Sequence, residues 1–172
     1  MVIGLGRKYR EKVIESIGII RKRSKVLDAG CGTGSLAIEI KKRYNESKIY
    51  GVDIDKKILE IAKKKSIKNQ VNILYQQAPL QSMPYPNSYF DIVYSSLVFH
   101  HLTTKDKILA AKEIYRILKK DGIFVLADFS STTLDSPTSG AILSGTTTIV
   151  GKINITQNTN ITNVTFYYFN IN

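Results

Sequence analysis

The spacing of apolar residues changes in a regular way along most of this chain. Four segments repeat apolar residues every three or four positions, as amphipathic helices do, and five short segments between them are strand-like. The predicted helices span residues 7–20, 35–44, 56–65 and 104–119, and the predicted strands span residues 25–28, 48–53, 71–75, 89–94 and 123–128. Strands that alternate with helices in this way form a parallel sheet with right-handed crossovers. The sequence therefore predicts an α/β fold with a doubly wound, mostly parallel sheet.

The helical periodicity also predicts which side chains face the core. The expected inward positions are Tyr9, Val13, Ile17 and Ile20 in the first helix and Ile108, Ala111, Tyr115 and Leu118 in the last. We expect Thr104 to cap the last helix and residues 120–122 to end it, because hydroxyl side chains favour helix starts and glycine favours helix ends.

The composition changes at Ser130. Nearly half of residues 130–172 are Ser, Thr or Asn, and this stretch has strand-like alternation without a helical period. We therefore divide the chain into a domain of residues 1–129 and a Ser/Thr/Asn-rich, β-rich C-terminal tail of residues 130–172.

Two strands are expected within the tail. We predict no long helix over residues 130–140, and a hairpin built from residues 145–156 and 161–171. An unpaired sheet edge is costly to leave bare, so we expect this hairpin to pair with the strand over residues 123–128.

Length and residue counts limit the class of protein. A chain of 172 residues with 43% hydrophobic residues favours one full-sized domain with a buried core. It has no apolar run near the ~18 residues of a membrane span, and its early charges do not resemble a signal peptide. One cysteine, Cys31, and two histidines exclude a disulfide framework and a multi-cysteine zinc site. We expect a cytoplasmic protein without a metal.

The net charge of +11 lies before residue 130. Much of it is lysine on predicted helix faces, as at residues 63–65, where it is solvated. The first 25 residues are different, because their many Arg and Lys side chains are balanced only by Glu11 and Glu15. This basic start predicts contact with an anionic surface, nucleic acid or lipid.

A glycine run after the first strand is the sharpest chemical signal. The segment Asp-Ala-Gly-Cys-Gly-Thr-Gly spans residues 28–34, between a strand and a helix. Glycines there let the backbone turn tightly and approach a ligand. The second strand ends in Asp53, 21 residues after Gly32. A carboxylate at about this distance binds a ribose diol in doubly wound folds.

The same residues indicate which nucleoside binds. The dinucleotide pattern G-x-G-x-x-G is broken here, because Ser35 stands where the third glycine would be. Asp28, Asp53 and Asp55 favour a ligand that carries positive charge. S-adenosylmethionine, with its sulfonium and ammonium groups, fits this description. Asp55 can equally be the N-cap of the next helix, and Cys31 is expected to be a small filler.

Four motifs resemble one family. VLDAGCGTG, GVDID, MPYPNSYFDIVYSSLVFHHL and KEIYRILKKDGIFVLADFS, in this order within residues 24–130, resemble the class I S-adenosylmethionine-dependent methyltransferases. The similarity is to the small-molecule branch that includes quinone-biosynthesis enzymes. It implies a Rossmann-like sheet, S-adenosylmethionine as cofactor, and in-line methyl transfer to a small-molecule acceptor.

The resemblance also implies roles for single residues. Asp28, Gly30, Gly32 and Gly34 would contact the methionine part, and Asp53 the ribose. Ile54 would lie against the adenine. The family often has an acid after the third strand; this chain has Gln76 and Gln77 there, and we expect Gln77 to meet the adenine amino group. Ser95, with Ser96, would line the cofactor side of the fourth strand's end.

Catalysis is less defined. His100 and His101 are candidates for a base, or are packed or capping residues. No base is required when the acceptor is already nucleophilic and the protein aligns the reactants. The Pro-Pro-Tyr and Pro-Cys motifs of DNA and amine methylation are absent from the printed sequence, which favours a small acceptor.

The tail departs from the family, which normally continues with a helix and two strands. Residues 135–168 resemble the opening of an immunoglobulin-like repeat of surface proteins. The alternative function is therefore a truncated or chimaeric cofactor-binding domain without turnover.

Overall fold

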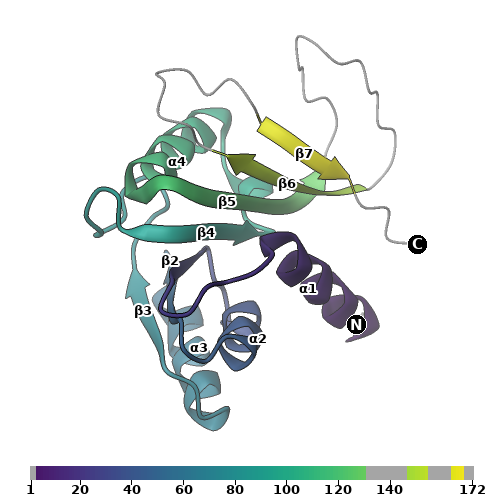
Figure 1. Ribbon diagram of the computed structural model, residues 1–172, viewed down its shortest axis with the longest axis vertical. Helices are drawn as coiled ribbons and strands as arrows, with labels where there is room; N and C mark the ends of the chain where they lie inside the picture. Colours follow the sequence, from purple (N-terminus) through teal and green to yellow (C-terminus); the bar gives the residue numbers. More distant parts are fainter. Residues whose placement is uncertain (1–2, 131–146, 155–163, 169–172) are drawn as a thin grey trace.

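The computed structural model describes residues 3–130, 147–154 and 164–168, with side chains over residues 6–128. Its strands form one seven-stranded sheet in the order β3-β2-β1-β4-β5-β6-β7, shown in Figure 1. The helices are α1 (Ile3–Ile17), α2 (Ser35–Arg43), α3 (Lys56–Lys68) and α4 (Thr104–Ile117), with a short 3₁₀ helix η1 (Phe99–His101). The strands are β1 (Lys25–Ala29), β2 (Lys48–Asp53), β3 (Ile73–Gln77), β4 (Phe90–Ser96), β5 (Leu118–Ser130), β6 (Thr147–Asn154) and β7 (Val164–Tyr168).

The first five strands are parallel, as the alternation of strands and helices predicts. β1 lies between β2 and β4, β3 pairs with β2, and β5 pairs with β4. The chain order therefore reverses at β1, so β1 and β4 border a switch point. In such sheets ligands bind outside the carboxyl ends of the strands at this point. The predicted doubly wound sheet is confirmed.

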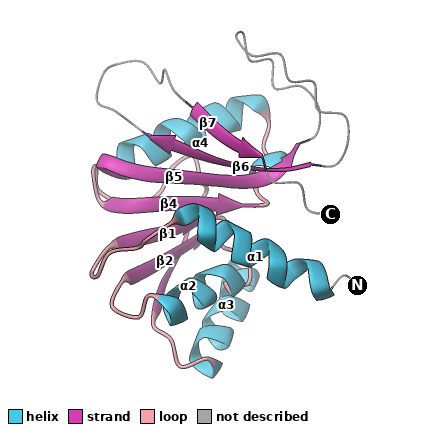
Figure 2. Cartoon of the chain, turned by 45° about the vertical axis from the view of Figure 1, so that its right-hand side comes forward, coloured by secondary structure: helices cyan, strands magenta, loops and turns pink. Residues whose placement is uncertain are grey.

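Alternate residues of each strand enter two separate cores. On β1, Val26 belongs to a cluster with α1 and α2, whereas Leu27 belongs to a cluster with α4. Figure 2 shows α1, α2 and α3 on one side of the sheet and α4 on the other. β1, β2 and β4 are buried on both faces, which explains why these strands read as nearly continuous apolar runs, whereas on the edge strand β3 Leu74 is 51% exposed.

The first helix differs from the prediction at both ends. α1 begins at Ile3 and ends at Ile17, because Gly18 follows in the left-handed conformation (φ 77°) that commonly terminates helices. Val13 and Ile17 are fully buried, as predicted, and Ile20 is buried beyond the helix end.

The last helix is shorter than predicted and turned differently. α4 ends at Ile117, and Leu118 already belongs to β5, so the predicted end at residues 120–122 was wrong. Asp121 there has a φ of 63°, and the pairing of β4 with β5 shifts register between Phe90 and Ile92. The turn-like sequence thus marks an irregularity in a strand.

The buried face of α4 also differs from the prediction. Its buried residues are Ala110, Ile114 and Ile117. Ile108 and Tyr115 are 53% and 41% exposed. Both sets fit a helical period, and only packing against the sheet selects between them. The predicted cap was one residue late as well.

Thr103, not Thr104, caps α4. The Thr103 hydroxyl accepts from the Asp106 N–H at 3.2 Å and donates to the Asp106 carboxylate at 2.7 Å. Both adjacent threonines satisfy the N-cap preference, so the sequence alone could not separate them.

The predicted hairpin is present on the edge of β5. β6 pairs antiparallel with β5, and β7 pairs antiparallel with β6. Both strands lie within the ranges expected from the sequence. The prediction for residues 130–140 falls mainly outside the described residues, and the domain boundary at residue 130 and the immunoglobulin-like resemblance stay predictions.

Two findings bear on membranes and metals. Over the described ranges, no helix is long and apolar enough to cross a membrane. Among the same residues, His, Cys, Asp and Glu nowhere gather in groups of three that could hold a metal ion.

Candidate functional site

The glycine turn lies at the carboxyl end of β1 and is pinned to β2. The N–H groups of Gly30 and Cys31 both donate to the Val52 carbonyl at 2.8 Å. Gly30, Gly32 and Gly34 have φ of 83°, 51° and 73°, all in the left-handed region. L-residues adopt this region at a cost, so glycine is the residue that lets the chain turn here.

The three glycines face different surroundings. A Cβ on Gly30 would lie 2.4 Å from Val98 Cγ2, and one on Gly34 would lie 2.3 Å from the Tyr75 hydroxyl oxygen. A Cβ on Gly32 would meet nothing within 4 Å. Packing therefore excludes side chains at the outer two positions, whereas Gly32 faces open space in which a ligand can approach the backbone.

Asp53 joins this turn to the end of β2. One oxygen of its carboxylate accepts from the Gly32 N–H at 2.9 Å and the other from the Asp55 N–H at 3.0 Å. The side chain is half-buried. A carboxylate has about four acceptor positions, so two remain for the hydroxyls of a ribose diol. The Gly32 N–H, which belongs to the glycine turn, therefore helps to fix the position of the Asp53 carboxylate.

An apolar side chain and an amide flank Asp53. Ile54 is 68% exposed, which is unusual for a large apolar residue and provides a flat surface for a base. The Gln77 amide Nε2 donates to the Ile54 carbonyl at 3.0 Å, and Gln77 pairs with Asp53 across β2 and β3. The structure therefore brings Asp53, Ile54 and Gln77 together, as the resemblance implies.

Asp28 is placed below the turn rather than on its surface. It is 2% exposed, and burial raises its pKa to about 7, while the Tyr94 hydroxyl opposes this and Asp53 adds to it. Asp28 pairs with Tyr94 across β1 and β4. The Tyr94 hydroxyl is itself fully buried and lacks a well-formed hydrogen bond among the described residues. A cation above this pair would stabilise the ionised carboxylate.

Ser95 lies near the end of β4, beside the end of β1. Its side chain is fully buried, and its hydroxyl donates to the Ala29 carbonyl at 2.7 Å. That bond ties β4 to the end of β1, which gives Ser95 a structural reason to be there. A contact between Ser95 and the cofactor stays a prediction.

Two further expectations are confirmed. Cys31 is buried in the turn, and burial raises the pKa of its thiol well above the usual range, so it remains a neutral filler. Asp55 caps α3, because its carboxylate accepts from the N–H groups of Lys57 and Ile58 at 2.7 and 3.3 Å.

The expectation that the lysines of residues 63–65 are solvated was wrong for Lys65, which is half-buried. Its ammonium group donates to the Ser35 hydroxyl at 2.6 Å and the Thr33 hydroxyl at 3.3 Å. Burial lowers its pKa. Lys65 therefore connects α3 to the start of α2 beside the glycine turn.

The two histidines after β4 have different surroundings. His100 is held by Asp128 at the end of β5, with Nδ1 2.5 Å from one carboxylate oxygen. His101 is exposed, and its ring lies 3.8 Å from that of His100 between centroids, tilted by 46°. Sequence reasoning missed Asp128 as the partner of His100; the available signal was an acid at the end of the fifth strand.

The N-terminal helix reaches the same strand ends. The Tyr9 hydroxyl on α1 donates to the Ala127 carbonyl at 3.0 Å and lies 2.9 Å from the Ser96 hydroxyl oxygen. Burial raises the pKa of Tyr9 to about 12, so the phenol is neutral and can donate. α1 is thereby attached beside the carboxyl ends of β4 and β5, as Figure 1 shows.

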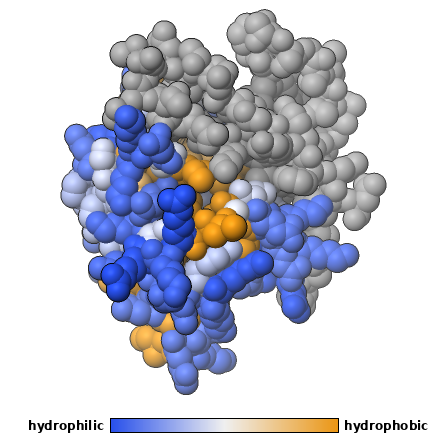
Figure 3. Space-filling view, in the orientation of Figure 1, coloured by the Kyte–Doolittle hydropathy of each residue, from blue (hydrophilic) through white to orange (hydrophobic). Residues whose placement is uncertain are grey.

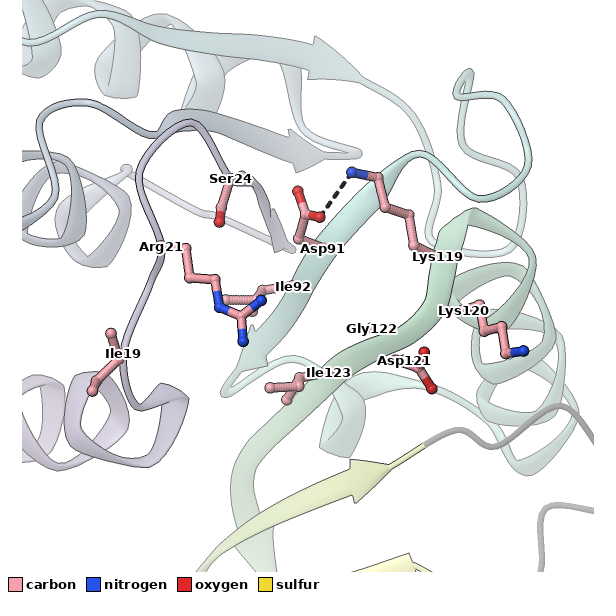
Figure 4. A pocket seen from close by; sticks show the side chains of 10 residues that line it. All are labelled: Ile19, Arg21, Ser24, Asp91, Ile92, Lys119, Lys120, Asp121, Gly122 and Ile123. Carbon is pink, nitrogen blue, oxygen red and sulfur yellow. Dashed lines mark hydrogen bonds and ion pairs between the residues drawn. The ribbon is translucent and has the colours of Figure 1, made fainter.

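A pocket at the opposite ends of the strands is a different place. It lies where β4 and β5 begin, and Figure 4 shows Lys119 paired with Asp91 in it. That ion pair measures 2.7 Å, and Asp91 also accepts from the Lys25 N–H at 2.8 Å. These bonds join β1, β4 and β5, and the pocket shares no residue with the glycine turn.

Comparison with known proteins agrees with this geometry. Residues 27–126 match the family described as "Methyltransferase domain". The chain is 34% identical over 133 residues to a ubiquinone/menaquinone biosynthesis C-methyltransferase of Francisella tularensis, covering 76% of this chain and 52% of that protein. The chain thus spans about half the length of such relatives.

Solved structures show the same fold. The YcgJ protein of Bacillus subtilis is 29% identical with a TM-score of 0.64, covering 72% of this chain and 51% of that one. The geranyl diphosphate C-methyltransferase of Streptomyces coelicolor, solved with S-adenosyl-L-homocysteine, has a TM-score of 0.65 at 16% identity, covering 73% and 46%.

The fold, the glycine turn with Asp53, and the family match define the class of protein. The chain belongs to the class I S-adenosylmethionine-dependent methyltransferases. The residues present fit that cofactor: an open face at Gly32, a diol acceptor at Asp53, an apolar surface at Ile54, and the buried Asp28–Tyr94 pair beneath.

Proposed function

We propose that this chain transfers a methyl group from S-adenosylmethionine to a small-molecule acceptor. The observation that carries the proposal is the linked geometry of Asp53 and Gly32, in which the carboxylate is fixed beside an open backbone surface. The methyl group is activated by the sulfonium of the cofactor, so the protein needs mainly to align the reactants and exclude water.

Each residue of the site has a proposed part in binding. The carboxylate of Asp53 would accept the ribose hydroxyls, Ile54 would cover one face of the adenine, and the Gln77 amide would face its edge. Asp28 would lie below the methionine part and offset its positive charge. Ser95 would act only by holding β4 against β1.

The acceptor is proposed to be a quinol-type ring that is methylated on carbon. Support comes from the relatives, which are named as ubiquinone/menaquinone biosynthesis C-methyltransferases. A one-ring or two-ring hydroquinone without a long side chain is a suitable probe. Mass spectrometry of the product would show methylation and its position.

Cofactor binding tests the proposal directly. By calorimetry, Asp53→Ala is expected to weaken S-adenosylmethionine binding by about 1–3 kcal/mol, the scale of lost charge-assisted hydrogen bonds. Glu60→Ala, which removes the same charge from the exposed side of α3, is the matched control and should leave binding unchanged. Asp53→Asn retains one oxygen acceptor and separates the charge from the hydrogen bonds. Absence of binding by the folded wild-type chain would refute the proposal.

The alternative is a cofactor-binding domain that does not turn over. It predicts cofactor binding with no methylated product from any acceptor. The comparisons favour the enzyme, because the family match covers the cofactor site and the curated relatives are methyltransferases.

Contact with an anionic surface has little support. Several cations of the basic start are already paired: Arg7 with Glu11, Arg10 with Glu39, and Lys22 with Glu46. Figure 3 shows hydrophilic side chains spread over most of the face that it presents, including α2 and α3. The cytoplasmic location expected from the sequence stays a prediction.

A further inference from the structure

Near its start, β5 bulges away from β4. The pairs of residues that flank the bulge are Phe90–Leu118 and Ile92–Ile123. One residue of β4, Asp91, therefore lies opposite residues 119–122 of β5. A Cβ on Gly122 would lie 2.8 Å from the Lys119 carbonyl oxygen, so these four residues form a turn that folds closely on itself. This turn forms one wall of the pocket at the amino ends of the strands.

The loop between α1 and β1 forms the other wall of this pocket, as Figure 4 shows. The Ser24 N–H donates to the Arg21 carbonyl at 3.1 Å, so residues 21–24 make a β-turn. Arg23, at the third position of this turn, has a φ of 63°, a conformation that costs more for arginine than for glycine. The Ser47 hydroxyl also donates to the Arg21 carbonyl at 3.1 Å. A strained turn, fixed from outside, thus presents Arg21 to the pocket, and strain of this kind is common at ligand sites.

The two walls enclose a cavity of about 350 Å³ that has apolar surfaces. Ile92 on β4 and Ile123 on β5 lie between the walls, and Ile19, on the loop, is 89% exposed. Pockets that bind small molecules have volumes of about 300–1,000 Å³ and are lined mainly by apolar side chains with a few polar groups. The cavity is therefore large enough for one small organic molecule.

The charges that line the cavity leave one cation without an anion. Lys119 forms an ion pair with Asp91 at 2.7 Å. Lys120 and Asp121 are exposed neighbours of opposite charge. Arg21 is exposed as well, and Figure 4 shows its side chain extending from the loop towards β4. Within the described part of the chain, its guanidinium forms no ion pair and no hydrogen bond. The cavity therefore has one positive charge in excess, and Arg21 carries it.

A guanidinium beside apolar side chains selects the chemistry of a ligand. Its planar N–H groups match the two oxygens of a carboxylate, which they bind through parallel hydrogen bonds. An apolar group attached to that carboxylate can cover Ile92 and Ile123. A phosphate dianion matches the cavity less well, because it carries twice the charge and Asp121 would repel it.

We propose that this cavity is a second ligand site, which binds a small apolar carboxylate through Arg21. The carboxylate pairs with the guanidinium, and the apolar part of the ligand packs on the isoleucines between the two walls. The site does not depend on the proposed function, because it lies at the amino ends of the strands and shares no residue with the glycine turn.

Titration of the full chain with benzoate tests the site. In nitrogen–proton correlation NMR spectra, benzoate at millimolar concentrations is expected to shift the amide signals of residues 19–24 and 119–123, and to leave those of the glycine turn in place. No shift at these two segments would overturn the proposal.

Three further probes separate the two parts of the ligand. Benzamide has the shape of benzoate without its charge, acetate has the carboxylate without the ring, and inorganic phosphate has a different anionic group. Each is expected to bind more weakly than benzoate. Equal binding of benzamide would show that the charge of Arg21 is not used, and equal binding of acetate or phosphate would show that the isoleucines are not used. Either result contradicts the proposal.

Substitution of Arg21 is the second measurement. Arg21→Gln removes the charge from an exposed side chain, so urea unfolding should match the wild type while the affinity for benzoate falls about 10–100-fold. Arg21→Lys keeps the charge without the planar N–H groups and should lie between the two. Lys22→Gln is the matched control, because Lys22 is 80% exposed and pairs with Glu46 outside the cavity. Equal loss of affinity in Arg21→Gln and Lys22→Gln would overturn the role of Arg21, since only net charge would then matter.

Discussion

The carboxyl edge of the sheet has two halves, one at the ends of β1 and β2 and one at the ends of β4 and β5, and they are built in different ways. At the ends of β1 and β2, the groups proposed to face the cofactor come from a short run of chain, and the hydrogen bond from Gly32 to Asp53 closes a span of 21 residues. At the ends of β4 and β5, the groups come from distant segments: Tyr9 contacts Ser96 across 87 residues and Ala127 across 118. The half proposed to bind the cofactor, the cofactor half, is a local motif, whereas the half at the ends of β4 and β5 is assembled only in the folded protein.

This contrast has a functional meaning. A local motif that consists mainly of backbone can persist while the rest of the sequence changes, and it fixes one ligand. A half assembled from separate helices and strands can change its lining without disturbing the sheet. The contrast predicts that changes in the glycine turn affect folding and cofactor binding, and that changes at the ends of β4 and β5 affect turnover.

The largest expected effect is the pH dependence that Asp28 causes. Its pKa rises from 3.8 to about 7 on folding because of burial, so the folded chain holds a proton that the unfolded chain has lost between these values. The free energy of unfolding therefore falls as the pH rises from about 4 to 7, by at most about 4 kcal/mol, and this group changes it no further above pH 7.

Asp28→Asn removes this titration. Urea unfolding of both proteins across that pH range should show the stability of the wild type, relative to the variant, decreasing with pH. Parallel pH curves would contradict the buried position of Asp28. Asp28 lies in the cofactor half, so we also expect the loss of its carboxylate to weaken cofactor binding.

The second prediction concerns Gly34. Gly34→Ala would put a methyl 2.3 Å from the Tyr75 hydroxyl and 3.1 Å from Ala62 Cβ, in addition to the left-handed backbone. We expect a loss of about 3 kcal/mol from overpacking and backbone strain together. Denaturant unfolding measures it.

Gly18 provides the matched control. It has nearly the same φ, 77°, but a Cβ there meets nothing within 4 Å. Gly18→Ala should therefore cost only the backbone part, about 1 kcal/mol. If the two variants are equally destabilised, the close packing of the cofactor turn is not what requires glycine at residue 34.

The sequence predicted the cofactor half well for a physical reason. Strand, glycine turn, helix and the acid at Asp53 are all encoded by neighbouring residues, so spacing alone locates them. The same holds for Asp55 as the cap of α3. By contrast, Ser95 is itself a candidate lining residue, but the direction of its side chain depends on the sheet, and its hydroxyl donates to the Ala29 carbonyl.

The parts that could not be predicted depend on tertiary packing. Two faces of α4 have helical periodicity, and only the sheet decides that Ile114 is buried while Tyr115 is 41% exposed. Two adjacent histidines look equivalent in sequence. Only the end of β5 distinguishes them, because Asp128 lies beside His100.

The smallest expected effect is at Tyr9, which attaches α1 to the ends of β4 and β5. Tyr9→Phe keeps the ring in the core but removes the hydroxyl that donates to Ala127 and contacts Ser96, so we expect a loss of about 1 kcal/mol. Hydrogen exchange should show faster opening of α1, with the glycine turn protected as before. Tyr115→Phe removes a hydroxyl from the exposed side of α4 and is the control. If exchange in the glycine turn rises as much as in α1, the two halves are one cooperative unit and the contrast between them does not extend to their stability.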